Sequence, residues 1–223
     1  MECEPQELEK EASTQEVQQA ENKVVKDKDA KNIEGSFLPK HPLQNQWKLW
    51  YIKYDKNKSW EDNMKQIASF DNVEDFWALF NHVVKPSDLK AGCDYCLFKD
   101  NISPMWEDER NKKGGRWLLQ LAKDRRKSLD SLWLETLFCL IGEMFGDNGD
   151  DICGAYIQIR GKADKLAIWT TDATHKDRIL GIGRLFKEKL FPGSAHDKPP
   201  LVYESHVATS NKTGSTARHM YKI

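Results

Sequence analysis

The stretch ICGAYIQIRGKADKLAIWTT, Ile152 to Thr171, decides the fold that we expect. Two runs of strand-forming residues flank the short polar connection Gly161 to Asp164, which is the pattern of a β-hairpin. Arg160 and Lys162 stand around the turn, and Lys165 begins the second strand. The three cations either form an exposed basic hairpin or bind a chain of phosphates, because several fixed cations can share one polyanion.

Helical patterns lie on both sides of the hairpin. Apolar residues recur over Ser128 to Phe145 and again over Lys176 to Leu190 at the spacing of a buried helix face. The GDNGDD sequence at Gly146 to Asp151 lacks the full ligand spacing of a calcium loop, so we interpret it as a helix-to-strand turn. Gly181-Ile182-Gly183 does not follow a strand and lacks the third glycine of a dinucleotide fingerprint.

Upstream, the sequence predicts two strands and one more helix. The strands are Gln46 to Tyr54 and Cys93 to Phe98, and the helix covers Val73 to Val84. Asp71 is the expected N-cap of this helix, because Glu74 follows three residues later as in a capping box. Downstream of the hairpin, LVYES at Leu201 to Ser205 predicts a short strand, and the SNKTGST sequence after it predicts a mobile loop.

The five cysteines are best interpreted as free thiols. They are odd in number, and the chain has no secretory signal pattern and no apolar run of transmembrane length, so we expect a soluble intracellular protein. Cys93 and Cys96 form a C-x-x-C pair without a second pair. Residues three apart on a strand point to opposite faces, so we do not expect a metal or redox site there.

Charge divides the chain into a tail and a domain. Residues 1–36 hold ten acidic residues, five lysines and no aromatic residue, a net charge of −5; since the whole chain carries −1, the remainder carries +4. The first segment cannot bury enough apolar surface to offset its ordering entropy, so we expect a disordered acidic tail. Residues 37–223 are the expected domain, and their mildly basic balance suits an anionic ligand.

Eight tryptophans are unusual for one domain, and three of them stand beside charge. In PMWEDERNKKGGRW, Pro104 to Trp117, Trp106 precedes Glu107, and a strand GRWLLQL follows. An indole next to an acid either packs in the core beside a solvated charge run, or holds a purine by stacking and by hydrogen bonds to its edge. Trp60, after the DKNKS turn, is either a loop anchor or a ligand contact, and Trp169 lies in the second hairpin strand.

Motifs of enzymes are missing from the sequence. It has no P-loop, no nucleophile elbow and no H-E-x-x-H motif, and its six histidines show no metal-ligand spacing. We therefore expect a binding protein without catalytic residues, metal or cofactor.

The strings HPLQNQWKLWY, VEDFWALFNHV, PMWEDE, GGRW, WLETLFCLIGE, CGAYIQIRGKADKLAIWTT and KTGST resemble the eukaryotic translation initiation factor 4E family, in order from about His41 to the C-terminus. The resemblance implies an α+β fold: a curved antiparallel sheet of eight strands with three long helices on its convex face. It also implies that the chain binds the 7-methylguanosine 5′ cap of messenger RNA and recruits it for translation initiation through a scaffold partner.

The resemblance assigns roles to individual residues. Those that match the contacts to the cap base are Trp60, Trp106, Glu107 and Trp169. Those that match the contacts to the cap phosphates are Arg116, Arg160, Lys162, Lys165 and Lys212. Ser215 matches a serine that is phosphorylated in the family.

A second surface is implied for a Tyr-x-x-x-x-Leu-hydrophobic helix of the scaffold protein and of 4E-binding repressors. Its matching residues are His41, Pro42, Val73, Trp77, Leu134, Glu135, Phe138 and Gly142. Phe138 replaces the usual leucine, and Gln158 replaces the more familiar asparagine of its strand. The alternative is a regulatory paralogue that binds the cap but engages the scaffold weakly. We expect a monomer in a heteromeric complex, located in the cytoplasm, with a nuclear pool left open.

Overall fold

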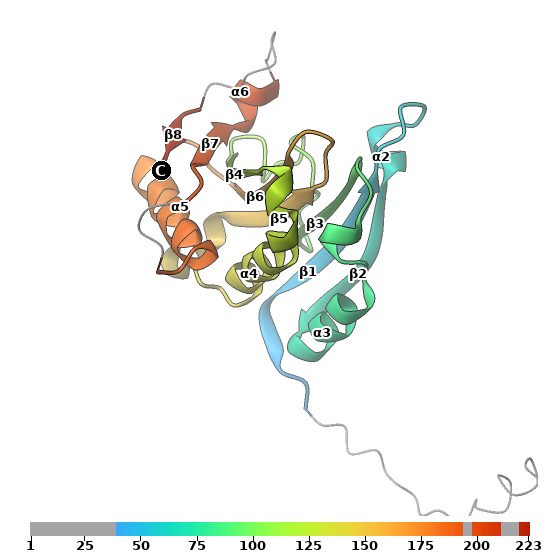
Figure 1. Ribbon diagram of the computed structural model, residues 1–223. Coiled ribbons are helices and arrows are strands. Elements are labelled where there is room, and N and C mark those ends of the chain that lie inside the picture. Colours follow the sequence, from blue (N-terminus) through green and yellow to red (C-terminus); the bar gives the residue numbers. More distant parts are fainter. Residues whose placement is uncertain (1–38, 194–197, 211–218) are drawn as a thin grey trace, which may run out of the picture. The chain divides into compact units, whose positions relative to one another are not determined.

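The computed structural model describes residues 39–193, 198–210 and 219–223 (Figure 1). The expected tail, together with Lys212 and Ser215, lies outside these residues. Within the described part, eight strands form one antiparallel sheet in the order β2-β1-β3-β5-β6-β4-β7-β8. The strands are β1 (Pro42–Lys53), β2 (Met64–Asn72), β3 (Cys93–Lys99), β4 (Gly115–Leu121), β5 (Ile152–Gln158), β6 (Asp164–Thr170), β7 (Leu201–Ser205) and β8 (Tyr221–Lys222).

The predicted hairpin lies in the middle of this sheet. Strands β5 and β6 pair antiparallel with Gln158 opposite Lys165 and Ala155 opposite Ile168. Strand β3 pairs with the outer side of β5, and β4 pairs with the outer side of β6. Both hairpin strands are therefore central, and almost all of their residues are buried.

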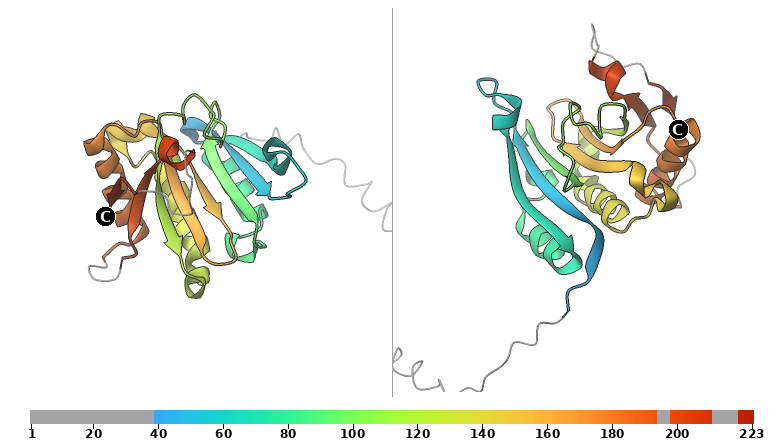
Figure 2. Two further views of the ribbon diagram at one scale, coloured as in Figure 1. Left: turned by 90° about the horizontal axis from the view of Figure 1, so that it is seen from above. Right: turned by 180° about the vertical axis from the view of Figure 1, so that it is seen from behind.

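Three long helices cover the convex face of the curved sheet, as expected (Figures 1 and 2). They are α3 (Val73–His82), α4 (Leu129–Ile141) and α5 (Lys176–Leu190). The main hydrophobic core lies between these helices and the sheet. Five shorter segments complete the described helices: α2 (Trp60–Asn63), α6 (His206–Ser210) and the 3-10 turns η1 (Pro86–Asp88), η2 (Lys123–Ser128) and η3 (Gly146–Asp151).

Trp117 explains the glycine in the middle of α5. Its ring is fully buried, and its indole N–H donates a hydrogen bond to the carbonyl oxygen of Ile179, 2.9 Å away. A methyl group at Gly183 would come within 2.4 Å of the ring. The helix can therefore approach the sheet this closely only because position 183 has no side chain.

The opposite face of the sheet holds a smaller hydrophobic cluster that includes Cys96, Phe98, Tyr156 and Trp169. Alternation along the strands separates the two faces, so Cys93 belongs to the helix-side core and Cys96 to the smaller cluster. The expected divergence of the C-x-x-C pair is confirmed, and the four cysteines of the described residues are free thiols.

Several local predictions were wrong. Asn72 caps α3, because it directly precedes Val73 and its side chain accepts a hydrogen bond from the Asp75 N–H; Asp71 does not cap it. The helix predicted to reach Phe145 ends at Ile141. Trp60 begins the short helix α2 instead of lying in a loop.

Strands β2 and β8 and helix α6 were not predicted. β2 is largely exposed and polar, while β8 spans two residues and α6 spans five, so none carries a strong periodic signal. Among the described residues, no helix is both long enough and apolar enough to span a bilayer.

Candidate functional site

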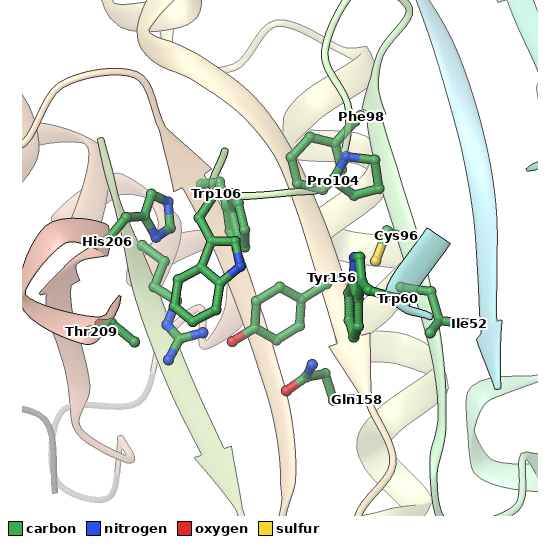
Figure 3. A pocket seen from close by; sticks show the side chains of 12 residues that line it. Ile52, Trp60, Cys96, Phe98, Pro104, Trp106, Tyr156, Gln158, His206 and Thr209 are labelled. Carbon is green, nitrogen blue, oxygen red and sulfur yellow. The ribbon is translucent and has the colours of Figure 1, made fainter. Parts of the chain in front are cut away.

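A cavity of about 250 Å³ opens on the face of the sheet that the long helices leave uncovered (Figure 3). Its lining comes from strands β1, β3, β4, β5 and β6, from helices α2 and α6, and from the loop before β4. The lining residues are Ile52, Trp60, Cys96, Phe98, Pro104, Trp106, Arg116, Tyr156, Gln158, Trp169, His206 and Thr209. Aromatic rings and a few polar groups therefore converge, as is usual in small-molecule sites.

Three of the predicted tryptophans lie together in this cavity. Trp60 and Trp106 remain 40% and 41% exposed, although exposed indoles are uncommon on a folded domain. Trp169 is buried deeper, with its ring centroid 4.2 Å from that of His206 and 5.4 Å from that of Phe98. The cavity thus offers two accessible indole rings and a third that is buried and fixed by packing.

The loop that carries Trp106 is braced from inside. The Asp108 carboxylate accepts a hydrogen bond from the Ser103 N–H at 2.9 Å. Asn111 has no exposed surface, and its side-chain amide donates to the carbonyl oxygens of Ser103 and Met105 at 2.8 and 2.6 Å. These bonds hold the base of the loop and leave Trp106 outside the core.

Glu107 does not line the cavity that contains Trp60. It is exposed and lies in an adjoining depression with Lys112, Val207 and Ser210. Trp106 and His206 line both hollows, so Glu107 is a neighbour of the cavity. The structure therefore brings the three predicted tryptophans together in one cavity. The predicted acid, Glu107, lies in the adjoining depression.

Among the predicted phosphate-binding residues that the structure describes, Arg116 alone lines the cavity. Its Nη2 lies 2.8 Å from Oε2 of the buried Glu204. Arg160 stands at the end of β5, and both of its terminal nitrogens contact the carboxylate of Asp94, Nη2 at 2.8 Å. Both guanidinium groups are therefore oriented by buried acids.

The lysines of the hairpin lie beyond these arginines. Lys162 is exposed at the turn, and Lys165 is half-buried at the start of β6. The Gln158 amide connects the two regions, because it lines the cavity and donates to Asp94 Oδ2 at 3.1 Å. Burial raises the pKa of Asp94, although the Arg160 guanidinium favours its charged form. Lys212 lies outside the described residues.

Sequence reasoning missed several cavity residues. Cys96, Phe98 and Tyr156 share one sheet face, which the alternation along β3 and β5 could have indicated. His206 had no such signal, because helix α6 was not predicted. Burial, reinforced by the charge of Arg116, lowers the pKa of His206 to about 3, so its imidazole is neutral at physiological pH.

The predicted partner surface is also assembled. The centroids of Trp77 on α3 and Phe138 on α4 lie 5.8 Å apart, and Trp77 is 38% exposed. The Val73 N–H donates to the His41 carbonyl oxygen at 2.9 Å, which joins the start of β1 to the start of α3. Pro42 is exposed beside them. On α4, Leu134 is half-buried like Phe138, while Glu135 and Gly142 are exposed.

Comparisons with known proteins agree with this architecture. A sequence model of the family described as eukaryotic initiation factor 4E matches residues 42–221. The chain is 55% identical over 188 residues to eukaryotic translation initiation factor 4E-1A of Danio rerio, covering 82% of this chain and 85% of that relative. It is 53% identical over 188 residues to eukaryotic translation initiation factor 4E of Homo sapiens, covering 82% and 84%.

Solved structures give the same result. Ascaris suum eIF4E-3 in complex with an m2,2,7G cap has a TM-score of 0.76 and 49% identity, covering 83% of this chain and 99% of that one. The complex of C. elegans eIF4E-3 with the 4E-binding protein Mextli and a cap analog has a TM-score of 0.75 and 46% identity, covering 83% and 100%. The chain therefore belongs to the eukaryotic initiation factor 4E family.

Proposed function

We propose that this domain binds the 7-methylguanosine 5′ cap of messenger RNA and recruits it for translation initiation through a scaffold partner. One observation carries the proposal: Trp60 and Trp106 come from separate elements, yet both present accessible rings to the same cavity. Relatives of about 50% identity are initiation factors, and similar structures were solved with cap ligands. Binding, without turnover of the cap, is the proposed activity.

The physical basis of recognition is the charge of the methylated base. Methylation at N7 gives guanine a delocalised positive charge, which the electron-rich faces of two indoles attract by a cation-π interaction that unmethylated guanine cannot make. Such interactions contribute about 2 kcal/mol when they are desolvated. Trp169 lines the same cavity and is held by Phe98 and His206, and it would provide an apolar surface for the methyl group.

Glu107 is the proposed reader of the guanine edge. A carboxylate only accepts hydrogen bonds, so it complements the N1 and N2 protons of guanine. Glu107 lies in the depression next to the cavity, so a turn of the loop tip at Trp106 and Glu107 is needed to bring both onto one base. The braces at Asp108 and Asn111 restrict that movement to the tip.

The triphosphate is proposed to run from the cavity toward the hairpin turn. Arg116 would hold its near end, and Arg160, Lys162 and Lys165 its far end, because these side chains follow one another from the cavity along β5 and β6. Lys212 is the proposed contact to the second nucleotide, and Ser215 nearby in sequence is the proposed phosphorylation site.

Retention on a 7-methyl-GTP resin tests the cap proposal. We expect the wild-type chain to be retained and to be eluted by free 7-methyl-GTP, but not by GTP at the same concentration. Trp106→Ala and Glu107→Ala should pass through the column. Val207→Ala is the matched control, because Val207 is 53% exposed and lines the depression without belonging to the proposed contacts. If both site variants were retained like wild type, the assigned site would be wrong.

The second proposal concerns the surface around Trp77 and Phe138. It suits an amphipathic helix, because accessible apolar side chains on two adjacent helices contact each other, and Glu135 is exposed on one of these helices. We propose that it binds the Tyr-x-x-x-x-Leu-hydrophobic helix of a scaffold protein and of 4E-binding repressors. Nothing in the comparisons specifically favours the alternative of a repressive paralogue.

Titration with a synthetic helix peptide tests this surface. Trp77→Ala should weaken binding of the peptide by roughly 10- to 100-fold, as expected for an aromatic hot spot. Cap affinity should not change, because Trp77 does not line the cavity. Unchanged peptide affinity in Trp77→Ala would refute the proposal. We also propose a cytoplasmic location, which imaging of the tagged full-length chain would test.

A further inference from the structure

Tyr156 presents an unexplained polar group on the floor of the cavity. The residue is 3% exposed, and within the described part of the chain its hydroxyl makes no hydrogen bond of good geometry. The Arg116 guanidinium interacts with the hydroxyl, but only as a donor, so the hydroxyl proton has no acceptor. Figure 3 shows the ring between Trp60 and Trp106 with its hydroxyl directed away from Trp60. A buried hydroxyl whose proton has no acceptor destabilises the fold by about 1 to 3 kcal/mol, so a ligand that supplies the acceptor would gain from this group.

The charged groups that act on this hydroxyl are the cation Arg116 and the acids Glu204 and Asp94. The Arg116 guanidinium carbon lies 5.8 Å from the centroid of the Tyr156 ring. Nε and Nη2 of Arg116 both donate to one oxygen of Glu204, which offsets much of its positive charge. An anion that bound next to Arg116 would therefore gain from the Tyr156 hydroxyl as a second, neutral hydrogen-bond donor.

We propose that the Tyr156 hydroxyl donates a hydrogen bond to the phosphate nearest the base of the bound cap, sharing that phosphate with Arg116. This inference rests on the cap-binding function proposed above. The hydroxyl oxygen is buried, so the side chains that cover it have to move as the phosphate enters. Burial raises the pKa of Tyr156 to about 12, which keeps the phenol protonated as a donor at physiological pH.

A phosphate contact is favoured over a contact to the base or to the ribose. The stacked base lies along the ring faces of Trp60 and Trp106, whereas the hydroxyl is directed away from Trp60. The Arg116 guanidinium next to the hydroxyl also attracts a charged phosphate more strongly than the uncharged ribose. The Tyr156 ring therefore lines the part of the cavity that takes the base, while its hydroxyl is placed to contact the first phosphate.

The proposal predicts opposite effects of one substitution on stability and on binding. Tyr156→Phe keeps the ring and removes the oxygen, so it should leave the unfolding midpoint unchanged or raise it. The same variant should bind 7-methyl-GTP and 7-methyl-GMP about tenfold more weakly than wild type, the loss of one hydrogen bond to a charged group. Affinity for 7-methylguanosine, which has no phosphate, should stay within about twofold.

Tyr203→Phe is the matched control. The Tyr203 hydroxyl is buried like that of Tyr156, but it lies 2.7 Å from the Thr170 hydroxyl and outside the cavity. Its removal should lower the unfolding midpoint and leave all three affinities unchanged. The two phenylalanine variants therefore separate loss of a structural hydrogen bond from loss of a ligand contact.

Calorimetric titration of wild type and both variants with the three ligands decides the matter. A loss for Tyr156→Phe that appears with 7-methyl-GMP and is absent with 7-methylguanosine supports the proposal. Equal losses with all three ligands, or no loss with any, would overturn it while the cap-binding function stands. Failure of the wild-type chain to bind 7-methyl-GTP would instead refute the proposed function itself.

Discussion

The two faces of the central sheet use tryptophan in opposite ways. On the helix-covered face, Trp117 is fully buried, its N–H is bonded to Ile179, and a glycine makes room for its ring. On the uncovered face, Trp60 and Trp106 are each about two-fifths exposed. Within the described residues, the cavity floor also leaves polar atoms of Tyr156, Trp169 and His206 without hydrogen-bond partners. The buried Trp47 indole on the helix-covered face also lacks a partner within the described residues, so the difference between the faces lies in access. On the uncovered face the residues with unmet groups line a cavity, where a ligand can satisfy them.

The largest expected effect is on the packed face. Gly183→Ala places a methyl group within 2.4 Å of the Trp117 ring, so we expect the free energy of unfolding to fall by about 2 to 3 kcal/mol. Cap affinity of the folded protein should not change. Urea denaturation and a 7-methyl-GTP titration measure the two quantities.

Gly181→Ala in the same helix is the control for that experiment. A methyl group there meets no atom closer than the Asn148 side-chain nitrogen at 3.9 Å, so the gain in helix propensity should stabilise the protein by about 0.5 to 1 kcal/mol. Equal effects of the two substitutions would contradict the close packing of Trp117 against α5.

An intermediate effect is expected from His206 on the uncovered face. Its folded-state pKa of about 3 lies below the ordinary value of 6.5, so between these pH values the unfolded chain binds the extra proton. The stability that the neutral imidazole contributes is therefore complete above pH 6.5 and declines as the pH falls toward 3. From pH 7.5 to 4.5 we expect wild type to lose about 2 kcal/mol more than His206→Gln.

Urea unfolding of both proteins at the two pH values measures this difference. Other acid-sensitive groups are common to the two chains and cancel in the comparison. If the free energy of unfolding fell by the same amount in both proteins, His206 would not be a buried neutral group in the folded state. It would then no longer count among the unmet groups on this face.

The smallest effect is expected at the rim of the site. Lys162 is exposed at the hairpin turn, where solvent screens its charge. Lys162→Ala should weaken 7-methyl-GTP binding about threefold and lower the slope of log affinity against log salt. Titrations at several salt concentrations give both values. An unchanged slope would exclude Lys162 from the phosphate path.

The sequence predicted what local pattern determines. The central hairpin and helix α5 have strong periodicity over their whole length, and the structure confirms them, α5 with its expected bounds. Strand β2 was missed because it is mostly exposed and largely polar, so its sequence carries little hydrophobic alternation. Its pairing with β1 holds it in the sheet. The N-cap of α3 differed by one residue, Asn72 for Asp71.

The site was only partly predictable for the same reason. Trp60, Trp106 and Trp169 were identified by the family resemblance and meet in one cavity. The position of Glu107 depends on the conformation of a braced loop, which neither pattern nor resemblance specifies. The unpartnered hydroxyl of Tyr156 emerges only when strands distant in sequence and Arg116 are placed together.

The affinity ratio between 7-methyl-GTP and GTP tests the central claim most directly, because the two ligands differ by one methyl group and its positive charge. We predict a ratio of at least about ten for wild type, from the cation-π interaction with Trp60 and Trp106. The ratio should fall clearly toward one in Trp60→Leu and in Trp106→Leu, because each variant keeps an apolar side chain but loses one of the two aromatic faces. A wild-type ratio near one, or a ratio that both leucine variants preserve, would contradict the account.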